Sequence, residues 1–211
     1  MSTTERPILF SGPMVRAILA GAKTQTRRVV KHQSDMEFDP GDPHYGPYWL
    51  AYAAGDLDGE DAKVRCPYGV PGDRLWVRET FAWLSDGTGC PDDADGVLYR
   101  ATDPGWDDEQ TGLRWRPSIF MPRAASRILL EITDVRVERL GEISEADARA
   151  EGVTDYTGKW WDGSPVVGGK WNAPTEAFRG LWESMNGPES WHPDRRVWVG
   201  SFRMVDGGVV A

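Results

Sequence analysis

Basic side chains are concentrated in two short segments that contain no acidic residue. Six of them lie between residues 6 and 34, where Lys23, Arg27 and Arg28 are close neighbours, and four arginines lie between residues 110 and 130. Such cations attract phosphate and carboxylate groups, and a lysine whose pKa is lowered toward neutrality can also accept a proton. The two segments predict a basic cleft in an otherwise acidic chain.

Other charged and aromatic side chains are candidates to line that cleft. Trp76, Arg78 and Glu79 belong to one expected strand, where the charged pair either faces the cleft or forms an ordinary cross-strand ion pair. Arg123 and Arg127 flank a small Ala-Ala-Ser sequence. They either contact phosphate or lie at a solvated edge.

The histidines and cysteines do not form a metal-binding pattern. His32, His44, His192, Cys66 and Cys90 include no pair with the short spacing typical of zinc ligands. Two cysteines are also too few for a disulfide framework, which favours a reducing cytoplasm. We therefore expect no metal and no other cofactor.

Composition sets wider limits on the function. The chain has 211 residues and a formal net charge of −9, which weighs against tight binding of long nucleic acid. It has no apolar run long enough for a membrane span and no secretory signal, so we expect no membrane partner. Its 11 tryptophans serve either as core residues or as stacking platforms for bases.

The hydrophobic patterns predict a mainly β, α+β domain of about five to six strands and two to three short helices. Most connections between the strands lack helices, which favours a small barrel over a doubly wound sheet. An extended segment is expected near 7–10, the strands are expected near 25–30, 75–83, 97–100, 119–121, 127–140 and 197–205, and the helices near 14–19, 144–151 and 174–185. Polar, glycine-rich insertions near 32–64, 84–116 and 154–175 interrupt a single domain over 1–211.

Four segments in the same order resemble the ASCH domain family, which has a PUA-like pseudo-barrel fold. They are the block Ile18–Arg28 (ILAGAKTQTRR), the turn Pro71–Leu75 (PGDRL), the segment Leu140–Val153 (LGEISEADARAEGV) and the closing strand Val197–Val205. The longer motifs CPYGVPGD and LWVRET resemble ASCH proteins of bacteriophages and prophages, which would act in the host cytoplasm. The three insertions depart from the minimal domain of the family.

The resemblance implies a chemistry. Some small bacterial members are amidohydrolases that remove the acetyl group from N4-acetylcytidine, and their catalytic lysine, threonine and glutamate fall here on Lys23, Thr26 and Glu151. A threonine hydroxyl becomes a nucleophile when a base takes its proton, and a neutral lysine can be that base. Positions i and i+3 face opposite ways on a regular strand, so convergence of Lys23 with Thr26 needs a bend at 24–25.

The substrate implied is a nucleoside or a short single-stranded nucleic acid. Arg27, Arg28, Trp76, Arg78, Glu79 and Arg123 are the candidates to bind it. Two alternatives use the same cleft: a module that binds RNA or a modified base without chemistry, and a ribonuclease. The sequence leaves open the acyl group, the choice between free and polymeric substrate, and the oligomeric state.

Overall fold

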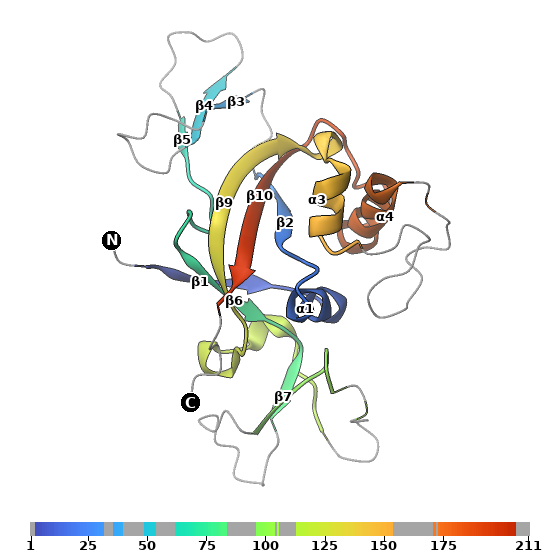
Figure 1. Cartoon of the computed structure of the whole chain (residues 1–211). Coiled ribbons are helices and arrows are strands. Elements are labelled where there is room, and N and C mark those ends of the chain that lie inside the picture. The colour runs from blue at the N-terminus through green and yellow to red at the C-terminus, as the bar shows by residue number, and fades with distance from the viewer. Residues whose placement is uncertain are drawn as a thin grey trace.

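A curled five-stranded sheet forms the centre of the molecule (Figure 1). The computed structural model describes residues 3–31, 36–39, 49–53, 62–83, 96–103, 105, 113–153, 171 and 173–205. The sheet has the order β1-β6-β9-β10-β2, and only β1 and β6 are parallel neighbours. Its strands are β1 (Glu5–Leu9), β2 (Gln25–Val29), β6 (Arg74–Arg78), β9 (Leu129–Arg139) and β10 (Arg196–Met204).

The curvature of β9 and β10 brings the two edges of the sheet toward each other (Figure 1). The register between these strands shifts between Ser201 and Phe202, and such a bulge bends a strand. At the open edges, the Arg28 guanidinium of β2 donates to the Leu9 carbonyl of β1 at 2.9 Å. The sheet is therefore an open pseudo-barrel of α+β class, as the sequence predicts.

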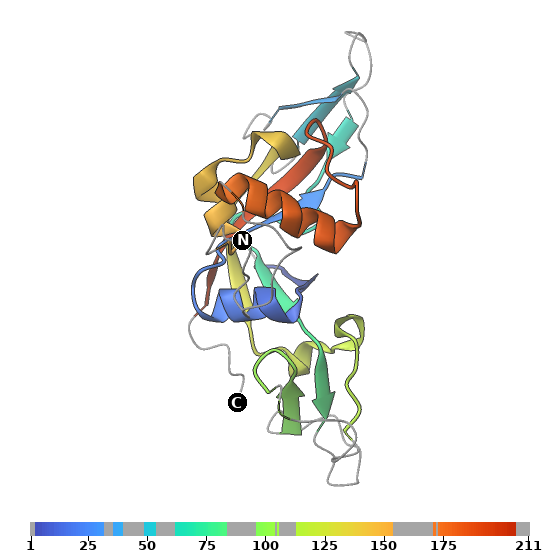
Figure 2. The ribbon, with the colours of Figure 1, turned by 90° about the vertical axis from the view of Figure 1, so that its right-hand side faces the viewer.

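Three α-helices pack against the sheet in the described part of the chain: α1 (Gly12–Leu19), α3 (Glu145–Ala150) and α4 (Pro174–Asn186) (Figure 2). The expected start of α3 is confirmed, because the Ser144 hydroxyl accepts the Asp147 N–H at 3.1 Å. α1 ends before Gly21, which has the positive φ of 72° that glycine adopts readily. None of these helices has the length and hydropathy needed to cross a bilayer.

Two cores hold these layers together. One lies between α1 and the strands and includes Met14, Val15 and Ile18. The other lies between α3, α4 and β10, where Val197 and Val199 meet the helices. Because side chains alternate along a strand, Trp198 faces the other side of β10, where it packs with Val30 and Cys66.

Several local expectations were wrong. The single strand expected over 75–83 is divided at Glu79 and Thr80 into β6 and β7 (Phe81–Trp83), and β7 pairs with β8 (Val97–Tyr99). The strand expected at 119–121 is the 3-10 turn η3 (Ser118–Phe120), with Pro117 before it and Pro122 after it. Proline has no N–H to donate to a sheet, which favours a turn here.

The insertion near 32–64 is more regular than expected. Its described strands β3 (Met36–Asp39), β4 (Trp49–Ala53) and β5 (Ala62–Val64) form a separate antiparallel sheet. The insertion near 154–175 lies almost wholly outside the described residues, as does much of the insertion near 84–116.

Candidate functional site

A buried lysine at the start of β2 forms the centre of the candidate site. The Lys23 ammonium donates to the Glu151 carboxylate at 2.7 Å, to the Glu151 carbonyl at 2.9 Å and to the Gln25 carbonyl at 2.8 Å. Lysine has three N–H donors, so all of them are used. The backbones of Lys23 and Glu151 also pair as an isolated antiparallel bridge, which holds the end of α3 against β2.

Arg27 extends this pair into an ionic network. Its side chain is fully buried and contacts Glu151 at 3.3 Å, Glu138 at 3.0 Å and Asp147 at 3.2 Å. It also donates to the Gln25 side chain at 2.7 Å. Arg27 therefore links β2 to β9 and α3 and has no exposed surface with which to bind substrate.

Burial shifts the protonation balance of the pair. It lowers the pKa of the Lys23 ammonium from its ordinary value, and the nearby Arg28 and Arg27 cations act in the same direction. The Glu151 carboxylate opposes this shift through charge attraction and a hydrogen bond. A lysine in such surroundings is closer to the neutral, proton-accepting form than an exposed lysine.

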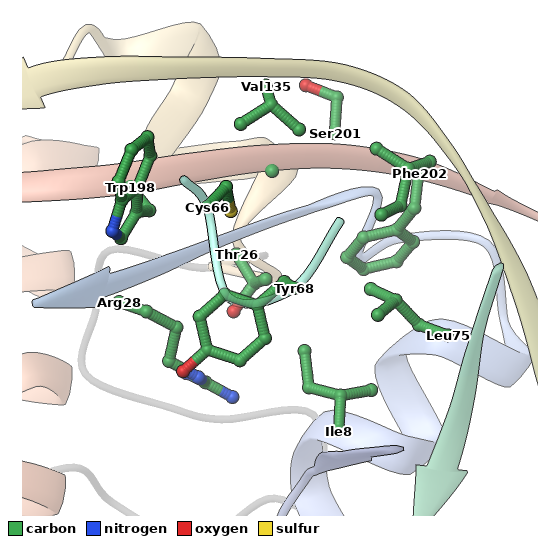
Figure 3. A pocket seen from close by; sticks show the side chains of 12 residues that line it. Ile8, Thr26, Arg28, Cys66, Tyr68, Leu75, Val135, Trp198, Ser201 and Phe202 are labelled. Carbon is green, nitrogen blue, oxygen red and sulfur yellow. The ribbon is translucent and has the colours of Figure 1, made fainter. Parts of the chain in front are cut away.

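A cavity lies on the opposite side of β2, within the concave face of the sheet (Figure 3). Cys66 and Tyr68, from the segment before β6, cross in front of it. The cavity has a volume of about 20 Å³, which is room for a small group and not for a pyrimidine ring. The cavity is lined by Ile8, Thr26, Arg28, Cys66, Tyr68, Leu75, Ile132, Val135, Trp198, Gly200, Ser201 and Phe202.

Thr26 connects the cavity with the ionic network. Its hydroxyl is buried and has no hydrogen-bond partner among the described residues. The Lys23 ammonium lies on the carbonyl of Gln25, which belongs to the peptide bond just before Thr26. The structure thus joins Lys23 to Glu151 and places Thr26 at the cavity, and no hydrogen bond links Lys23 to Thr26.

One aromatic ring lies between the two regions. The Lys23 ammonium is 5.7 Å from the centre of the Phe10 ring, and the Arg28 guanidinium is 5.4 Å from it. Phe10 in turn packs against Phe202, which lines the cavity. Phe10 therefore separates the Lys23 ammonium from the cavity lining.

The remaining sequence candidates lie elsewhere. Along β6, Trp76 and Arg78 lie on the face opposite to that of the cavity-lining Leu75. The Arg78 guanidinium stacks on the Trp76 ring at 4.6 Å. Glu79 is buried in a bidentate pair with Arg127, at 2.9 and 3.1 Å. Of the two sequence interpretations of Glu79, the ion pair is the one observed, although its partner is Arg127.

Arg123 also lies away from the cavity lining. Its guanidinium donates to the Glu5 carboxylate at 2.8 Å on the surface. Among the described residues no cluster of three metal-binding side chains occurs. His32, His44 and Cys90 fall outside the described residues.

Sequence reasoning missed the residues that close the cavity. Cys66 and Tyr68 belong to the motif CPYGVPGD, for which the resemblance implied no role toward a substrate, and Trp198 and Phe202 belong to the expected closing strand. Register supplies the missing signal, because Trp198 is opposite Arg28 and Gly200 is opposite Thr26 in the ladder of β10 and β2. Directly paired residues share a face, so Thr26 and Arg28 identify the face of Trp198.

Comparisons with known proteins gave structural neighbours only. No family model matches the sequence, and no curated protein matches it. A crystal structure of a protein from Enterococcus faecalis V583, of the family DUF984, is 13% identical and covers 97% of this chain and 82% of its own, with a TM-score of 0.38.

The second neighbour is an ASCH domain from Lactobacillus crispatus JV V101. It is 14% identical and covers 95% of this chain and 79% of its own, with a TM-score of 0.36. Its name is that of the family that the sequence motifs resemble.

Proposed function

We propose that this chain is an amidohydrolase that removes a small N4-acyl group, such as acetyl, from a cytosine derivative. The observation that carries the proposal is the unpartnered, buried Thr26 hydroxyl at the cavity, one peptide bond from the Lys23–Glu151 pair. A buried hydroxyl without a partner is costly for folding, so its retention favours a role toward a ligand. The ASCH resemblance supplies the chemistry.

The small volume of the cavity favours a short acyl group. Its lining includes the apolar side chains of Ile8, Leu75, Ile132 and Val135, which suit a methyl group. A whole pyrimidine ring does not fit the open space, so the base remains at the mouth while the acyl carbonyl reaches Thr26. Tyr68 and Arg28 are available there to stack on the base.

The proposed reaction has two stages. In the first, the Thr26 oxygen attacks the acyl carbon and its proton passes to the neutral Lys23 amine. The bond from the acyl carbon to N4 then breaks, Lys23 returns the proton to N4, and the acyl group remains on Thr26. In the second, water attacks this ester, which releases the carboxylic acid and restores the hydroxyl.

Arg28 has the position to stabilise the charge that develops on the acyl oxygen. Its side chain lines the cavity, and one of its nitrogens is already held by the Leu9 carbonyl. A cation preorganised in this way stabilises an oxyanion more than it stabilises a neutral carbonyl. Glu151 orients Lys23 and provides the carboxylate that can hold its proton.

The test is turnover of N4-acetylcytidine, with cytidine measured by chromatography. We expect product from the wild type and none from Thr26→Val or Lys23→Met. Thr24→Val is the matched control, because Thr24 is exposed and lies in the same block. Turnover by Thr26→Val at the wild-type rate would overturn the nucleophile assignment.

A second function is favoured by one observation. All three N–H donors of Lys23 are satisfied, which suits a permanently charged, structural lysine. The chain would then bind a modified base without chemistry. Saturable binding of N4-acetylcytidine by the folded wild type, with no cytidine formed, would establish this function and exclude the hydrolase for this substrate.

A further inference from the structure

Two exposed hydrophobic side chains lie side by side in η3. Ile119 is 59% exposed and Phe120 is 68% exposed, the highest values for large hydrophobic residues in the described part of the chain. Pro117 and Pro122 flank the turn and restrict its backbone. An apolar pair held in a fixed, exposed turn is a candidate contact surface.

Basic residues flank this turn in the sequence, and one more contacts it from β6. Arg114 and Arg116 precede it and are exposed, and neither pairs with an acid among the described residues. Arg78 lies next to it and donates to the Ile119 carbonyl at 3.2 Å. Arg123 follows the turn and pairs with Glu5 at 2.8 Å, so the surplus of charge near Phe120 is positive among the residues that the structure describes.

We propose that this η3 surface, formed by Arg78, Arg114, Arg116, Ile119 and Phe120, binds single-stranded nucleic acid. A base can stack on the exposed Phe120 ring while the arginines neutralise neighbouring phosphates. An acidic peptide would use the cations alone and leaves the flat ring unexplained. One consequence of this inference rests on the proposed function: the hydrolase would act on a cytosine within a polynucleotide and not on a free nucleoside.

A short series of contacts connects the η3 surface with the cavity. Arg28 at the cavity donates to the Leu9 carbonyl at 2.9 Å, and Leu9 is opposite Arg78 in the ladder of β1 and β6. Neighbouring strands are about 5 Å apart, and Arg78 then donates to the Ile119 carbonyl at 3.2 Å. A single-stranded nucleic acid bound at η3 can therefore present a nearby nucleotide to the cavity.

The first test measures binding without any chemistry. The probe is a fluorescein-labelled single-stranded oligocytidine RNA without acetyl groups, followed by fluorescence anisotropy. We expect Phe120→Ala to weaken binding about fivefold or more. Met185→Ala is the control, because Met185 is 42% exposed on α4, and it should bind as the wild type does.

Charge gives an independent measurement in the same assay. Removing one phosphate contact with Arg116→Gln should reduce the slope of log affinity against log salt by about 0.7, the value per contact for a single strand. Arg149→Gln is the matched control, since Arg149 is an exposed arginine of α3 that pairs with Glu145 at 3.2 Å. An unchanged slope for Arg116→Gln would overturn the assignment of that residue.

The outcomes separate this inference from the proposed hydrolase. The probe carries no acyl group, so its binding does not depend on turnover, and a chain without hydrolase activity can still support the surface. Equal affinity of the wild type and Phe120→Ala would overturn the surface. If Phe120→Ala changes the sedimentation of the protein without RNA, the nucleic-acid surface is overturned and the turn is an interface between two copies of the chain.

The link to the substrate needs one more comparison. If the hydrolase is active, Phe120→Ala should lower kcat/KM for an acetylated oligocytidine and leave kcat/KM for N4-acetylcytidine unchanged. An equal effect on both substrates would refute the polymeric substrate while leaving the hydrolase intact.

Discussion

Replacing Glu151 with glutamine leaves the buried Lys23 ammonium without a carboxylate. Among the described residues Glu151 is the one acid paired with Lys23, at 2.7 Å. Glu151 itself has a second cation, because Arg27 contacts it at 3.3 Å. We therefore expect Glu151→Gln to destabilise the fold more than Lys23→Met does.

The size of this difference follows from burial. Removing one member of a buried ion pair costs about 3–5 kcal/mol when the other charge is left alone. Neutralising a lysine instead costs about 1.4 kcal/mol for each pH unit below its ordinary pKa of 10.5, or about 5 kcal/mol at neutral pH. Lys23→Met leaves Glu151 with Arg27, so its cost should be about 1–3 kcal/mol.

The pH dependence has a definite sign. Burial lowers the pKa of Lys23 in the folded chain, so the unfolded chain binds more protons between that lowered value and 10.5. Stability therefore rises with pH across this window. In Glu151→Gln the carboxylate no longer raises the pKa of Lys23, so the pH window in which stability rises extends to lower pH. The loss of stability relative to the wild type therefore shrinks as pH approaches 10.5.

Urea denaturation followed by circular dichroism measures these free energies at neutral pH and at higher values. Glu183→Gln is the control, because Glu183 forms an exposed pair with Arg179 at 3.2 Å and should change stability by less than about 0.5 kcal/mol. Equal costs for Lys23→Met and Glu151→Gln, or a deficit independent of pH, would refute the assignment of Glu151 as the essential partner of a charged Lys23.

Three further changes test the surroundings of the site. Thr26→Val removes a buried hydroxyl that lacks a partner, so it should raise stability by about 1 kcal/mol, and a lower melting temperature would contradict that. Gly69→Ala should lower the free energy of unfolding by well over 1 kcal/mol in a urea titration, because Gly69 has a φ of 114° and an added Cβ would lie 2.8 Å from the Asp73 carboxylate. Gly72→Ala is the comparison and should cost about 1 kcal/mol, because a Cβ there meets open space. Arg127→Leu leaves Glu79 buried and alone, at about 3–5 kcal/mol. Burial raises the pKa of Glu79 above 4.5 in the folded chain, so this last deficit should grow as pH rises through that raised pKa, and a deficit that shrinks would count against the pair.

The elements of the domain could be predicted where hydrophobic periodicity and capping agree. The helix expected at 174–185 differs from α4 by one residue at its C-terminal end, and the strand expected at 197–205 differs from β10 by one residue at each end. The segment 75–83 could not be divided correctly, because its sequence is rich in strand-forming residues throughout. At the division, Glu79 forms a buried pair with Arg127, which is 48 residues away in sequence and which a local pattern does not reveal.

The candidate site was only partly accessible to sequence reasoning. A glutamate at the end of a short helix opposes the helix dipole, which indicates a compensating cation, and Lys23 is that cation. Arg27 and Arg28 are neighbours of one type in the sequence, yet alternation buries the first among acids and directs the second to the cavity. Sequence alone did not show which of the two was buried.

The three acceptors around Lys23 constrain how the proposed reaction can begin. A neutral lysine has two N–H donors and a lone pair, so one of the acceptors must be released before the nitrogen can receive a proton. The Glu151 carboxylate, at 2.7 Å, is the acceptor that can itself hold the departing proton. Burial and the nearby Arg27 cation favour the neutral Lys23 amine by lowering its pKa, whereas the Glu151 carboxylate raises that pKa and favours the ammonium. The balance between burial and Arg27 on one side and the Glu151 carboxylate on the other therefore sets the fraction of chains with a reactive amine, and Arg27 influences the chemistry without touching the substrate.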